Sequence, residues 1–159
     1  MPKPTKLASP FWVVLLIFTV VRLYFGARGV PYENPRIAAV SIVTLTFVAA
    51  ALTAALARGL AGLSLKDAAK TGALMGLYAQ VVIFTMTMIS IAAGIQTYFN
   101  YPAAINDELI GQTITFANAL PPRLGGLVVG PITAAVAAMI GWVIGAVMNM
   151  NVGLGKKIS

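Results

Sequence analysis

The hydrophobic residues of this chain gather in four long runs that are separated by short polar segments. The last run, 124–148, contains no charged residue. A helix over this run is about 37 Å long at a rise of 1.5 Å per residue, which is enough to cross a hydrocarbon core of roughly 30 Å with some tilt. The pattern therefore predicts a transmembrane helix here, and each of the other three runs predicts another.

The predicted fold class is an all-α integral membrane protein, with four transmembrane helices in an antiparallel bundle that forms a single domain over 1–159. The helices are expected at about 10–26, 36–58, 65–96 and 123–149. Ser64 and Asp67 have the spacing of a capping box and predict the start of the third helix. Lys3 and Lys6 precede the first apolar run, as in a signal peptide, but no A-x-A cleavage site follows. We therefore expect this run to be retained as a span.

The connection between the third and fourth helices is the longest in the chain, and it contains Asp107 and Glu108. Polar residues suited to a helix start are followed by apolar residues at three- and four-residue spacing, up to a Pro-Pro pair. This pattern predicts a short interfacial helix at 106–118. A re-entrant segment over 103–120 is the alternative, but the two carboxylates favour water over the membrane interior.

Small residues recur at a four-residue step along the third and fourth helices. Such G-x-x-x-G spacings let two helix backbones approach closely, which matters in a membrane because lipid removes the hydrophobic drive for helices to associate. We expect these residues to form the helix-packing core of the protein. They are Gly72, Gly76, Gly126, Gly130, Ala134, Ala138, Gly141 and Gly145.

Three polar residues, Gln80, Thr87 and Ser90, follow one stripe of the third helix. An amide without a partner in hydrocarbon costs several kcal/mol, so Gln80 must face protein, a ligand or water. We expect an interhelical hydrogen bond, with contact to a solute as the alternative. The methionines Met86 and Met88 point to different faces of the same helix, so they predict adaptable packing and not a copper site.

The composition supports the membrane class, because 59% of the residues are hydrophobic and only 9% are charged, against about 25% charged in soluble domains. The net charge is +7, yet the eleven Lys and Arg residues lie beside apolar runs and form no single stripe. They predict helix ends, and no nucleic acid is expected as a partner.

The chain has no Cys and no His. This excludes disulfides, thiolate chemistry, imidazole metal sites, histidine-ligated haem and histidine general bases. The four acidic residues are expected in loops or at helix starts, outside the spans. A membrane-embedded nucleophile such as Ser90 would lack an activating base. We therefore expect no enzyme activity, no catalytic or metal site and no cofactor.

Four spans place both termini on the same side as the connection 58–70. This side carries seven of the positive residues and the other side carries four. By the positive-inside rule both termini are cytoplasmic, as expected for a multi-pass protein of a plasma (inner) membrane. Aromatic and basic residues near the span ends are expected to anchor the helices at the interfaces, with the long side chain of Arg22 reaching to the headgroups. These anchors are Trp12, Arg22, Tyr24, Tyr98 and Tyr101.

The two helical hairpins share dipeptides. A Tyr-Phe pair closes the first helix of each hairpin, and a Pro-Arg pair opens the second, at 35–36 and at 122–123. A duplicated two-helix unit is therefore one alternative for the origin of the fold.

The function expected from these features is contact between helices. The small-residue faces exceed what one small bundle needs, which predicts a non-catalytic accessory or scaffolding subunit of a larger membrane complex, or a homo-oligomer. The expected partners are membrane lipids and other membrane subunits or copies of the chain. The alternative is a small oligomeric transporter or channel for a neutral or weakly polar solute, lined by Gln80, Thr87 and Ser90.

Overall fold

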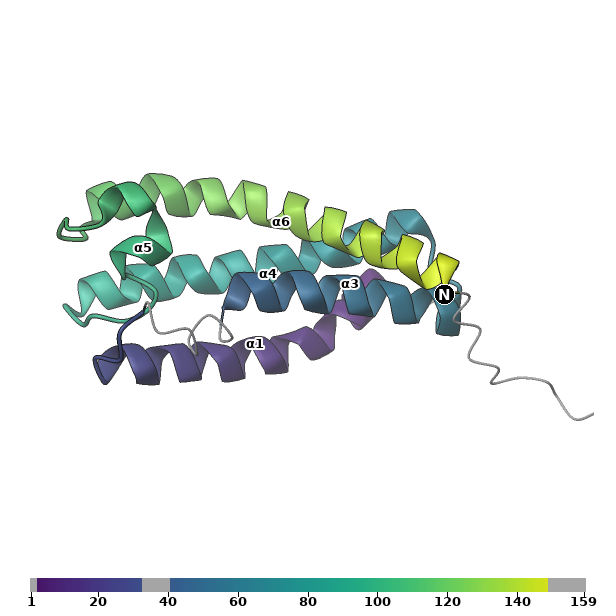
Figure 1. The fold of residues 1–159 in the computed structure, drawn as a ribbon, viewed down its shortest axis with the longest axis horizontal. Coiled ribbons are helices and arrows are strands. Elements are labelled where there is room, and N and C mark those ends of the chain that lie inside the picture. Colours follow the sequence, from purple (N-terminus) through teal and green to yellow (C-terminus); the bar gives the residue numbers. More distant parts are fainter. Residues whose placement is uncertain (1–2, 33–40, 149–159) are drawn as a thin grey trace, which may run out of the picture.

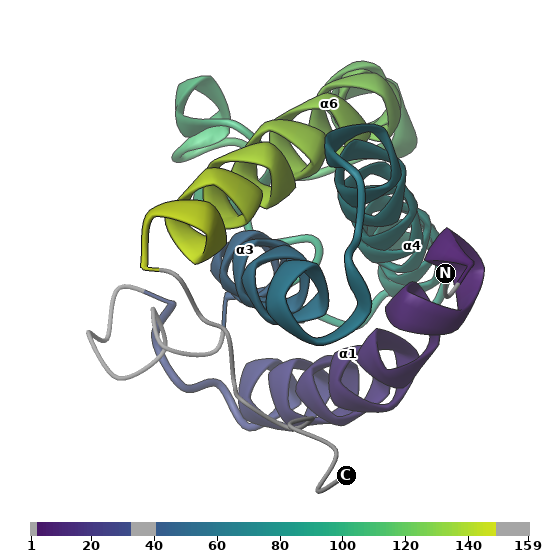
Figure 2. The ribbon, with the colours of Figure 1, turned by 90° about the vertical axis from the view of Figure 1, so that its right-hand side faces the viewer.

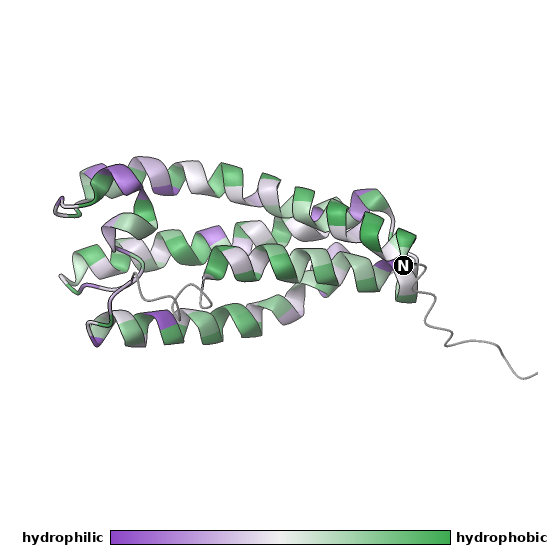
Figure 3. Cartoon of the chain, viewed as in Figure 1, coloured by the Kyte–Doolittle hydropathy of each residue, from purple (hydrophilic) through white to green (hydrophobic). Residues whose placement is uncertain are grey.

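The computed structural model describes residues 3–32 and 41–148, and this part of the chain is helical without strands. Four of its helices are long and apolar enough to cross a membrane, and hydrophobic positions dominate the middle of these helices (Figure 3). They are α1 (Pro4–Ala27), α3 (Ile42–Ala61), α4 (Leu65–Ala92) and α6 (Phe116–Val147). The predictions of an all-helical chain and of four helices with the length and composition of membrane spans are confirmed.

The long helices lie side by side, and the connection from α3 to α4 is at the opposite end from the connection between α4 and α6 (Figure 1). α6 packs against α3 and α4 along most of its length. α1 packs against the same two helices from the other side, so α1 and α6 are separated by the α3–α4 pair (Figure 2). Two short elements, α5 (Pro102–Ile105) and the 3-10 helix η1 (Asp107–Leu109), lie in the connection from α4 to α6.

α1 begins earlier than the sequence pattern predicts, because Pro10 lies inside the helix instead of at its first residue. A proline at this position removes the N–H that would bond to the carbonyl of Lys6. The Ser9 hydroxyl donates to that same carbonyl oxygen at 2.9 Å. This side-chain bond replaces the missing backbone bond, so the helix continues through the proline.

α3 begins at Ile42, later than predicted, because Ser41 has an extended backbone and its hydroxyl oxygen accepts a bond from the Thr44 amide at 3.3 Å. The predicted segment 36–40 lies outside the described residues. α3 ends at Ala61, and its C-cap residue Gly62 has a φ of 63°, in the left-handed region that favours glycine.

α4 begins at Leu65, as predicted, and Ser64 caps it by accepting from the Asp67 amide at 3.1 Å. Its end is earlier than the predicted residue 96. The helix stops at Ala92, and Gly94 follows with a φ of 64°.

The predicted interfacial helix at 106–118 is wrong. α6 itself begins at Phe116, well before the predicted residue 123, and a reciprocal capping box of Thr115 and Asn118 starts it. The Pro121-Pro122 pair, expected to end a helix, lies inside α6. The backbone bonds that these prolines remove involve carbonyls of the first helical turn, near the end of the helix where water can serve as donor. Pro122-Arg123 therefore does not open a helix, which removes one of the parallels between the two hairpins; the other Pro-Arg pair lies outside the described residues.

The predicted small-residue ridges lie at the helix contacts. A Cβ on Gly76 of α4 would be 2.6 Å from the Gly130 carbonyl oxygen of α6, and a Cβ on Gly72 would be 2.6 Å from the Ala138 Cβ. On the other side of the α6 ridge, a Cβ on Gly145 would be 2.7 Å from the Ala55 carbonyl oxygen of α3. These approaches require glycine. The ridge residues Ala134 and Ala138 are buried, as are Gly130, Gly141 and Gly145.

The end of the molecule near the N-terminus has its own link between α3 and α6. The Arg58 guanidinium lies 3.6 Å from the centre of the Trp142 ring and donates to the Trp142 carbonyl at 3.2 Å. The indole N–H of Trp142 donates to the Leu63 carbonyl at 2.6 Å. These contacts attach the turn after α3 to the last part of α6.

Candidate functional site

The backbone of Tyr98 and Phe99 is the point where three of the long helices meet. Arg22 of α1 donates from Nη2 to the Tyr98 carbonyl at 3.1 Å. Thr87 of α4 lies 2.9 Å from the Phe99 carbonyl oxygen, and Arg123 of α6 donates to that same oxygen from Nη2 at 2.7 Å. Two neighbouring carbonyls therefore tie together helices that are far apart in the sequence.

Further contacts fix the segment 97–99 against α1 and α4. A Cβ on Gly26 of α1 would be 2.6 Å from the Tyr98 amide nitrogen, so only glycine permits this approach. The Tyr98 hydroxyl donates to the Val30 carbonyl at 2.8 Å, and the hydroxyls of Ser90 and Thr97 are bonded at 2.8 Å. The side chains of Tyr98 and Phe99 are both buried.

The sequence pattern predicts that the Arg22 side chain extends outward to the headgroups, but the side chain is only 7% exposed and turns into the protein. Its guanidinium lies 5.4 Å from the ring centre of Phe99, 5.6 Å from that of Tyr98 and 5.8 Å from that of Tyr32. The physical reason is the folded connection after α4, which supplies a carbonyl and aromatic faces that attract a cation. The charge therefore lies inside the protein.

Arg123 lies opposite Arg22 and is partly buried. Its Nε is buried and bonds to no described residue. The sequence pattern predicts Arg123 as the first residue of the fourth helix. Because α6 begins earlier than predicted, Arg123 instead lies inside the helix, where its side chain reaches the Phe99 carbonyl.

Arg22 and Arg123 line one small cavity of about 60 Å³. The Tyr32 ring and the N-cap residue Ser41 of α3 contribute to its wall, as do apolar side chains of α3 and α4. A cationic group from α1 and one from α6 thus face the same space from opposite sides of the α3–α4 pair. Among the described residues the one ion pair, Lys70 with Asp67 at 3.9 Å, belongs to the start of α4 and not to this cavity.

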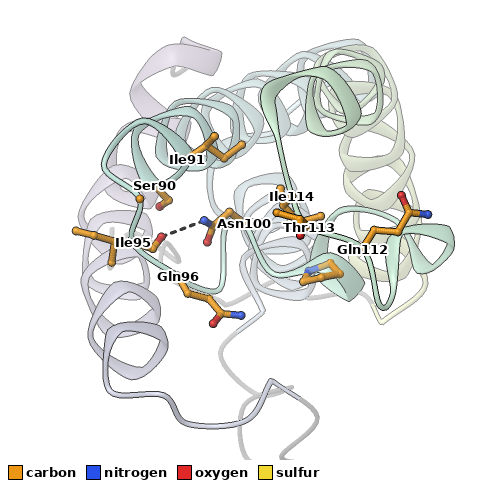
Figure 4. Close-up of a pocket in the computed structure, with 10 residues that line it drawn as sticks. Ser90, Ile91, Ile95, Gln96, Asn100, Gln112, Thr113 and Ile114 are labelled. Carbon is orange, nitrogen blue, oxygen red and sulfur yellow. Dashed lines mark hydrogen bonds between the residues drawn. The ribbon is translucent and has the colours of Figure 1, made fainter.

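A second hollow lies beside the first, between the end of α4 and the connection to α6 (Figure 4). Asn100 lies in its centre and donates to the Ile95 carbonyl at 3.0 Å, while Gln96 and Gln112 are at its wall (Figure 4). Amide side chains dominate its polar part, and it contains no charged residue. It is a polar pocket beside the connection from α4 to α6.

The three polar residues predicted on one stripe of α4 have different surroundings. Thr87 and Ser90 are buried, and both bond to carbonyls of their own helix and to the connection that follows it. Gln80 is partly exposed and lies across the α6 glycines: a Cβ on Gly126 would be 2.7 Å from its Oε1, and one on Gly130 would be 2.7 Å from its Nε2. Gln80 therefore fills the space that the two glycines leave.

The predicted aromatic anchors also differ in their exposure and surroundings. Tyr24 is 55% exposed on α1, whereas Tyr98 is 2% exposed inside the protein. Tyr101 stacks on Tyr32 with ring centres 5.2 Å apart, and Trp12 contacts Tyr78 in a tilted arrangement with ring centres 4.7 Å apart. The position of Tyr98 after an apolar run predicts an interface residue, but its ring is buried because the chain turns back after Gly94.

No protein-family model, curated protein or solved structure matches this chain. A function can therefore be inferred only from the residues of this chain. In the described residues no group of three or more His, Cys, Asp or Glu side chains comes together. The pairing of Arg22 with Arg123 was missed from the sequence, although a charged residue inside each of two apolar helices is the signal that could have suggested it.

Proposed function

We propose that the chain is an integral membrane protein whose four long helices cross one membrane as an antiparallel bundle, and that it acts by contact with other membrane proteins, as a non-catalytic accessory or scaffolding subunit or as a homo-oligomer. The length and apolar composition of α1, α3, α4 and α6 support the membrane assignment. The distribution of positive residues supports cytoplasmic termini in a plasma (inner) membrane.

The contact function is supported mainly by the distribution of polar and apolar side chains on the long helices. Several polar groups are bonded within the protein, and the outward faces are apolar. The hydroxyls of Thr19, Thr46 and Thr87 each bond to a carbonyl one turn earlier in their own helix. The outward positions of the long helices are instead occupied by large apolar side chains. What the helices present to their surroundings is therefore apolar surface, which suits lipid and partner helices.

The small ridge of α6 is used within the chain, so a partner would meet a different surface. The opposite face of α6 carries an exposed row of β-branched side chains, which we call the outer α6 face. It consists of Val128, Ile132, Val136, Ile140 and Val147. These stiff side chains lose little conformational freedom when another helix packs against them.

The first test is the mass of the full-length protein extracted gently into nanodiscs, with identification of every co-purifying polypeptide. A fixed ratio of another polypeptide, or a discrete homo-oligomer, is expected. Ile132→Trp on the outer α6 face should then release the partner, whereas Val20→Trp, at an exposed position of α1, should not. A monomer with lipid alone in every preparation would contradict the contact function.

One observation favours the transporter or channel as a second candidate. Gln80 is partly exposed in the middle of α4, and no hydrogen bond joins its amide to another described residue. An amide at that depth would find a partner in water or a polar solute. Thr87 and Ser90 add less to such a path, because their hydroxyls already bond within the protein.

The transporter is tested by uptake of small neutral solutes into proteoliposomes that contain the full chain. Transport that Gln80→Leu abolishes, with the helical spectrum unchanged, would establish this second function. Equal uptake in protein-free liposomes would exclude it for the solutes tested.

A further inference from the structure

We propose that an apolar groove between the start of α1, α4 and α6 binds one anionic phospholipid, with an acyl chain in the groove and the phosphate at two lysines. We call it the lysine groove. Its lining includes Lys3, Lys70, Ala73, Leu74, Leu77 and Pro131. The site rests on the membrane assignment proposed above. It is separate from the contact function, because no residue of the outer α6 face lines it.

The apolar part of the lysine groove has the shape of a site for a linear chain. Its volume is about 590 Å³. Lys70 and Leu77 are about two turns of α4 apart, or about 10 Å along the helix axis. Leu77 is 40% exposed, so the groove is open along this side of α4. An acyl chain can therefore enter from the side, out of the surrounding lipid.

The charge of the groove comes from two exposed lysines on different elements. Lys3 is the N-cap residue of α1, and Lys70 lies near the start of α4. Lys70 is 3.9 Å from an oxygen of Asp67, whose carboxylate also accepts from the Ser64 hydroxyl at 2.8 Å. Among the described residues no carboxylate forms an ion pair with Lys3. The two ammonium groups therefore outweigh the one carboxylate beside them.

The other three acidic residues of the chain belong to the far end of the molecule. Asp107 and Glu108 lie in η1, at the opposite end of the long helices from the connection between α3 and α4 (Figure 1). Glu33 directly follows Tyr32, whose ring contacts Tyr98 and Tyr101 at that same end. The positive charge of the lysine groove is therefore not neutralised from these positions.

The sign of this charge selects the occupant. The net charge of the chain is +7, and its residues 149–159 contain two lysines and no acidic side chain. Neither Met1 nor Pro2, ahead of Lys3, has a charged side chain. A second copy in the same membrane orientation would bring its own lysines to this end, which opposes its approach. The headgroup of an anionic phospholipid has the complementary charge.

The headgroup, and not the acyl chain, gives the groove its selectivity. Lipid tails are as apolar as leucine, so a chain gains little by leaving the bilayer for an apolar groove. A lysine can lay its methylene stem along apolar surface while its ammonium group reaches a phosphate. In the proposed orientation this end is cytoplasmic, and the cytoplasmic leaflet is the one with a negative surface potential. The lipid is therefore expected from the inner leaflet.

A second apolar groove provides an internal comparison. It lies between α1 and α3, has a volume of about 430 Å³ and is lined by Phe11, Ala49 and Thr53 among others. No charged residue lines it. This groove can accept an acyl chain as well, but it has no group that distinguishes an anionic headgroup from a zwitterionic one. Only the lysine groove should therefore be selective.

The experiment uses the full-length protein in mixed micelles that contain phosphatidylglycerol and phosphatidylcholine with the same acyl chains at equal concentration. Native mass spectrometry counts the bound lipids of each kind. One phosphatidylglycerol per chain should be retained about tenfold in preference to phosphatidylcholine. Reconstitution into liposomes separates this site from the membrane assignment. A chain that does not insert would contradict that assignment, whereas an inserted chain without the preference would contradict the lipid site alone.

Charge variants separate the lysine groove from general surface charge. Lys3→Gln, which disturbs no described ion pair, should reduce the preference about fivefold, and Lys70→Gln should do the same. Lys66→Gln is the matched control, because Lys66 is an exposed lysine at the start of α4 that does not line the groove. It should leave the preference nearly unchanged. Circular dichroism checks that each variant keeps its helices.

Shape variants test the apolar part of the site without a change of charge. Ala73→Phe should fill the lysine groove and remove the preference. Ala49→Phe should fill the groove between α1 and α3 and leave the preference unchanged. If Ala73→Phe does not fold, the lysine variants still test the site.

Four results would overturn the proposal. The first is wild-type protein without a preference between the two lipids. The second is an equal reduction in Lys66→Gln and Lys70→Gln, since this would mean a diffuse surface effect. The third is an unchanged preference in folded Ala73→Phe, which would mean that the headgroup is bound without the groove. The fourth is a dimer that Ala73→Phe disrupts, because a second copy would then occupy the groove.

Discussion

Thr87 and Arg123 share one hydrogen-bond acceptor, the backbone carbonyl oxygen of Phe99, at 2.9 Å and 2.7 Å. The two residues belong to α4 and α6, and the acceptor belongs to the connection between these helices. The single hydroxyl proton of Thr87 is shared between this oxygen and the Ile83 carbonyl, which lies 2.7 Å from the same hydroxyl, while Arg123 donates to the Phe99 oxygen alone. The connection after α4 is therefore held by its own helix and by the helix that follows it.

Replacing Thr87 tests how much this shared acceptor stabilises the fold. Thr87→Val keeps the shape of the side chain but removes its bond to Phe99, and we expect a loss of about 1 kcal/mol in the free energy of unfolding. The measurement is unfolding in mild detergent, followed by circular dichroism. Thr133→Val is the matched control, because Thr133 bonds only to carbonyls of its own helix, at 2.9 Å and 3.0 Å. Equal losses in both variants would show that the Phe99 contact contributes nothing specific.

The glycines of α6 provide a second test, since they differ in their surroundings. A Cβ on Gly141 would come within 2.6 Å of the Ala51 Cα, whereas a Cβ on Gly125 would have nothing within 4 Å. Gly141→Leu should therefore destabilise the protein by about 1–3 kcal/mol or more through overpacking. Gly125→Leu should leave the unfolding midpoint nearly unchanged. Similar midpoints for the two variants would mean that α3 and α6 do not approach as closely as described.

The helices and their packing faces could be predicted from the sequence, because apolar runs and four-residue glycine spacings report directly on period and length. Helix ends were less predictable. Pro10 and Pro122 suggested boundaries, but a serine hydroxyl in α1 and a capping box in α6 allow each helix to include its prolines. These compensations depend on which side chain faces which carbonyl, and residue spacing does not reveal this.

The arginine pair is hard to predict from the sequence for a related reason, although a charged residue inside each of two apolar helices hints at it. Arg22 and Arg123 meet only because the chain after Gly94 turns back and places the Tyr98 and Phe99 carbonyls between α1 and α6. A contact between residues so distant in the sequence is set by tertiary structure and not by local pattern. By contrast, the packing role of Gly76 and Gly141 follows from local spacing, and the structure places both at helix contacts.

Trp142, at the end of the molecule near the N-terminus, can be compared with Trp12 for its effect on stability. Its indole N–H donates to the Leu63 carbonyl at 2.6 Å, while Trp12 contributes a ring in tilted contact with Tyr78. Trp142→Phe should lower the free energy of unfolding by about 1–2 kcal/mol, because the Leu63 carbonyl loses its donor and Arg58 loses part of its aromatic face. Trp12→Phe keeps a ring in place and should have the smaller effect. Thermal unfolding in the same detergent shows which of the two variants is less stable. A larger loss in Trp12→Phe than in Trp142→Phe would contradict the structural role of the Trp142 hydrogen bond.

A substitution at Gln80 can distinguish a packing role of its side chain from a hydrogen-bonding role of its amide. Gln80→Met keeps a long flexible side chain over the α6 glycines and removes only the amide. If Gln80 acts by filling the space beside Gly126 and Gly130, the free energy of unfolding should change by less than about 1 kcal/mol. Gly130→Leu, which would collide with the Gln80 side chain, should be clearly less stable. A large loss in Gln80→Met itself would show that the amide has a structural hydrogen-bond partner.

The orientation in the membrane can be tested with cysteines, because the natural chain contains none. Leu65 at the start of α4 and Gln112 in the connection to α6 are both exposed and lie at opposite ends of the long helices (Figure 1). If the termini are cytoplasmic, a membrane-impermeant maleimide added to intact cells should label Gln112→Cys and not Leu65→Cys. Permeabilised cells should show labelling of both, which controls for reactivity. The opposite pattern would place the connection between α4 and α6 at the cytoplasmic surface and would contradict the predicted orientation.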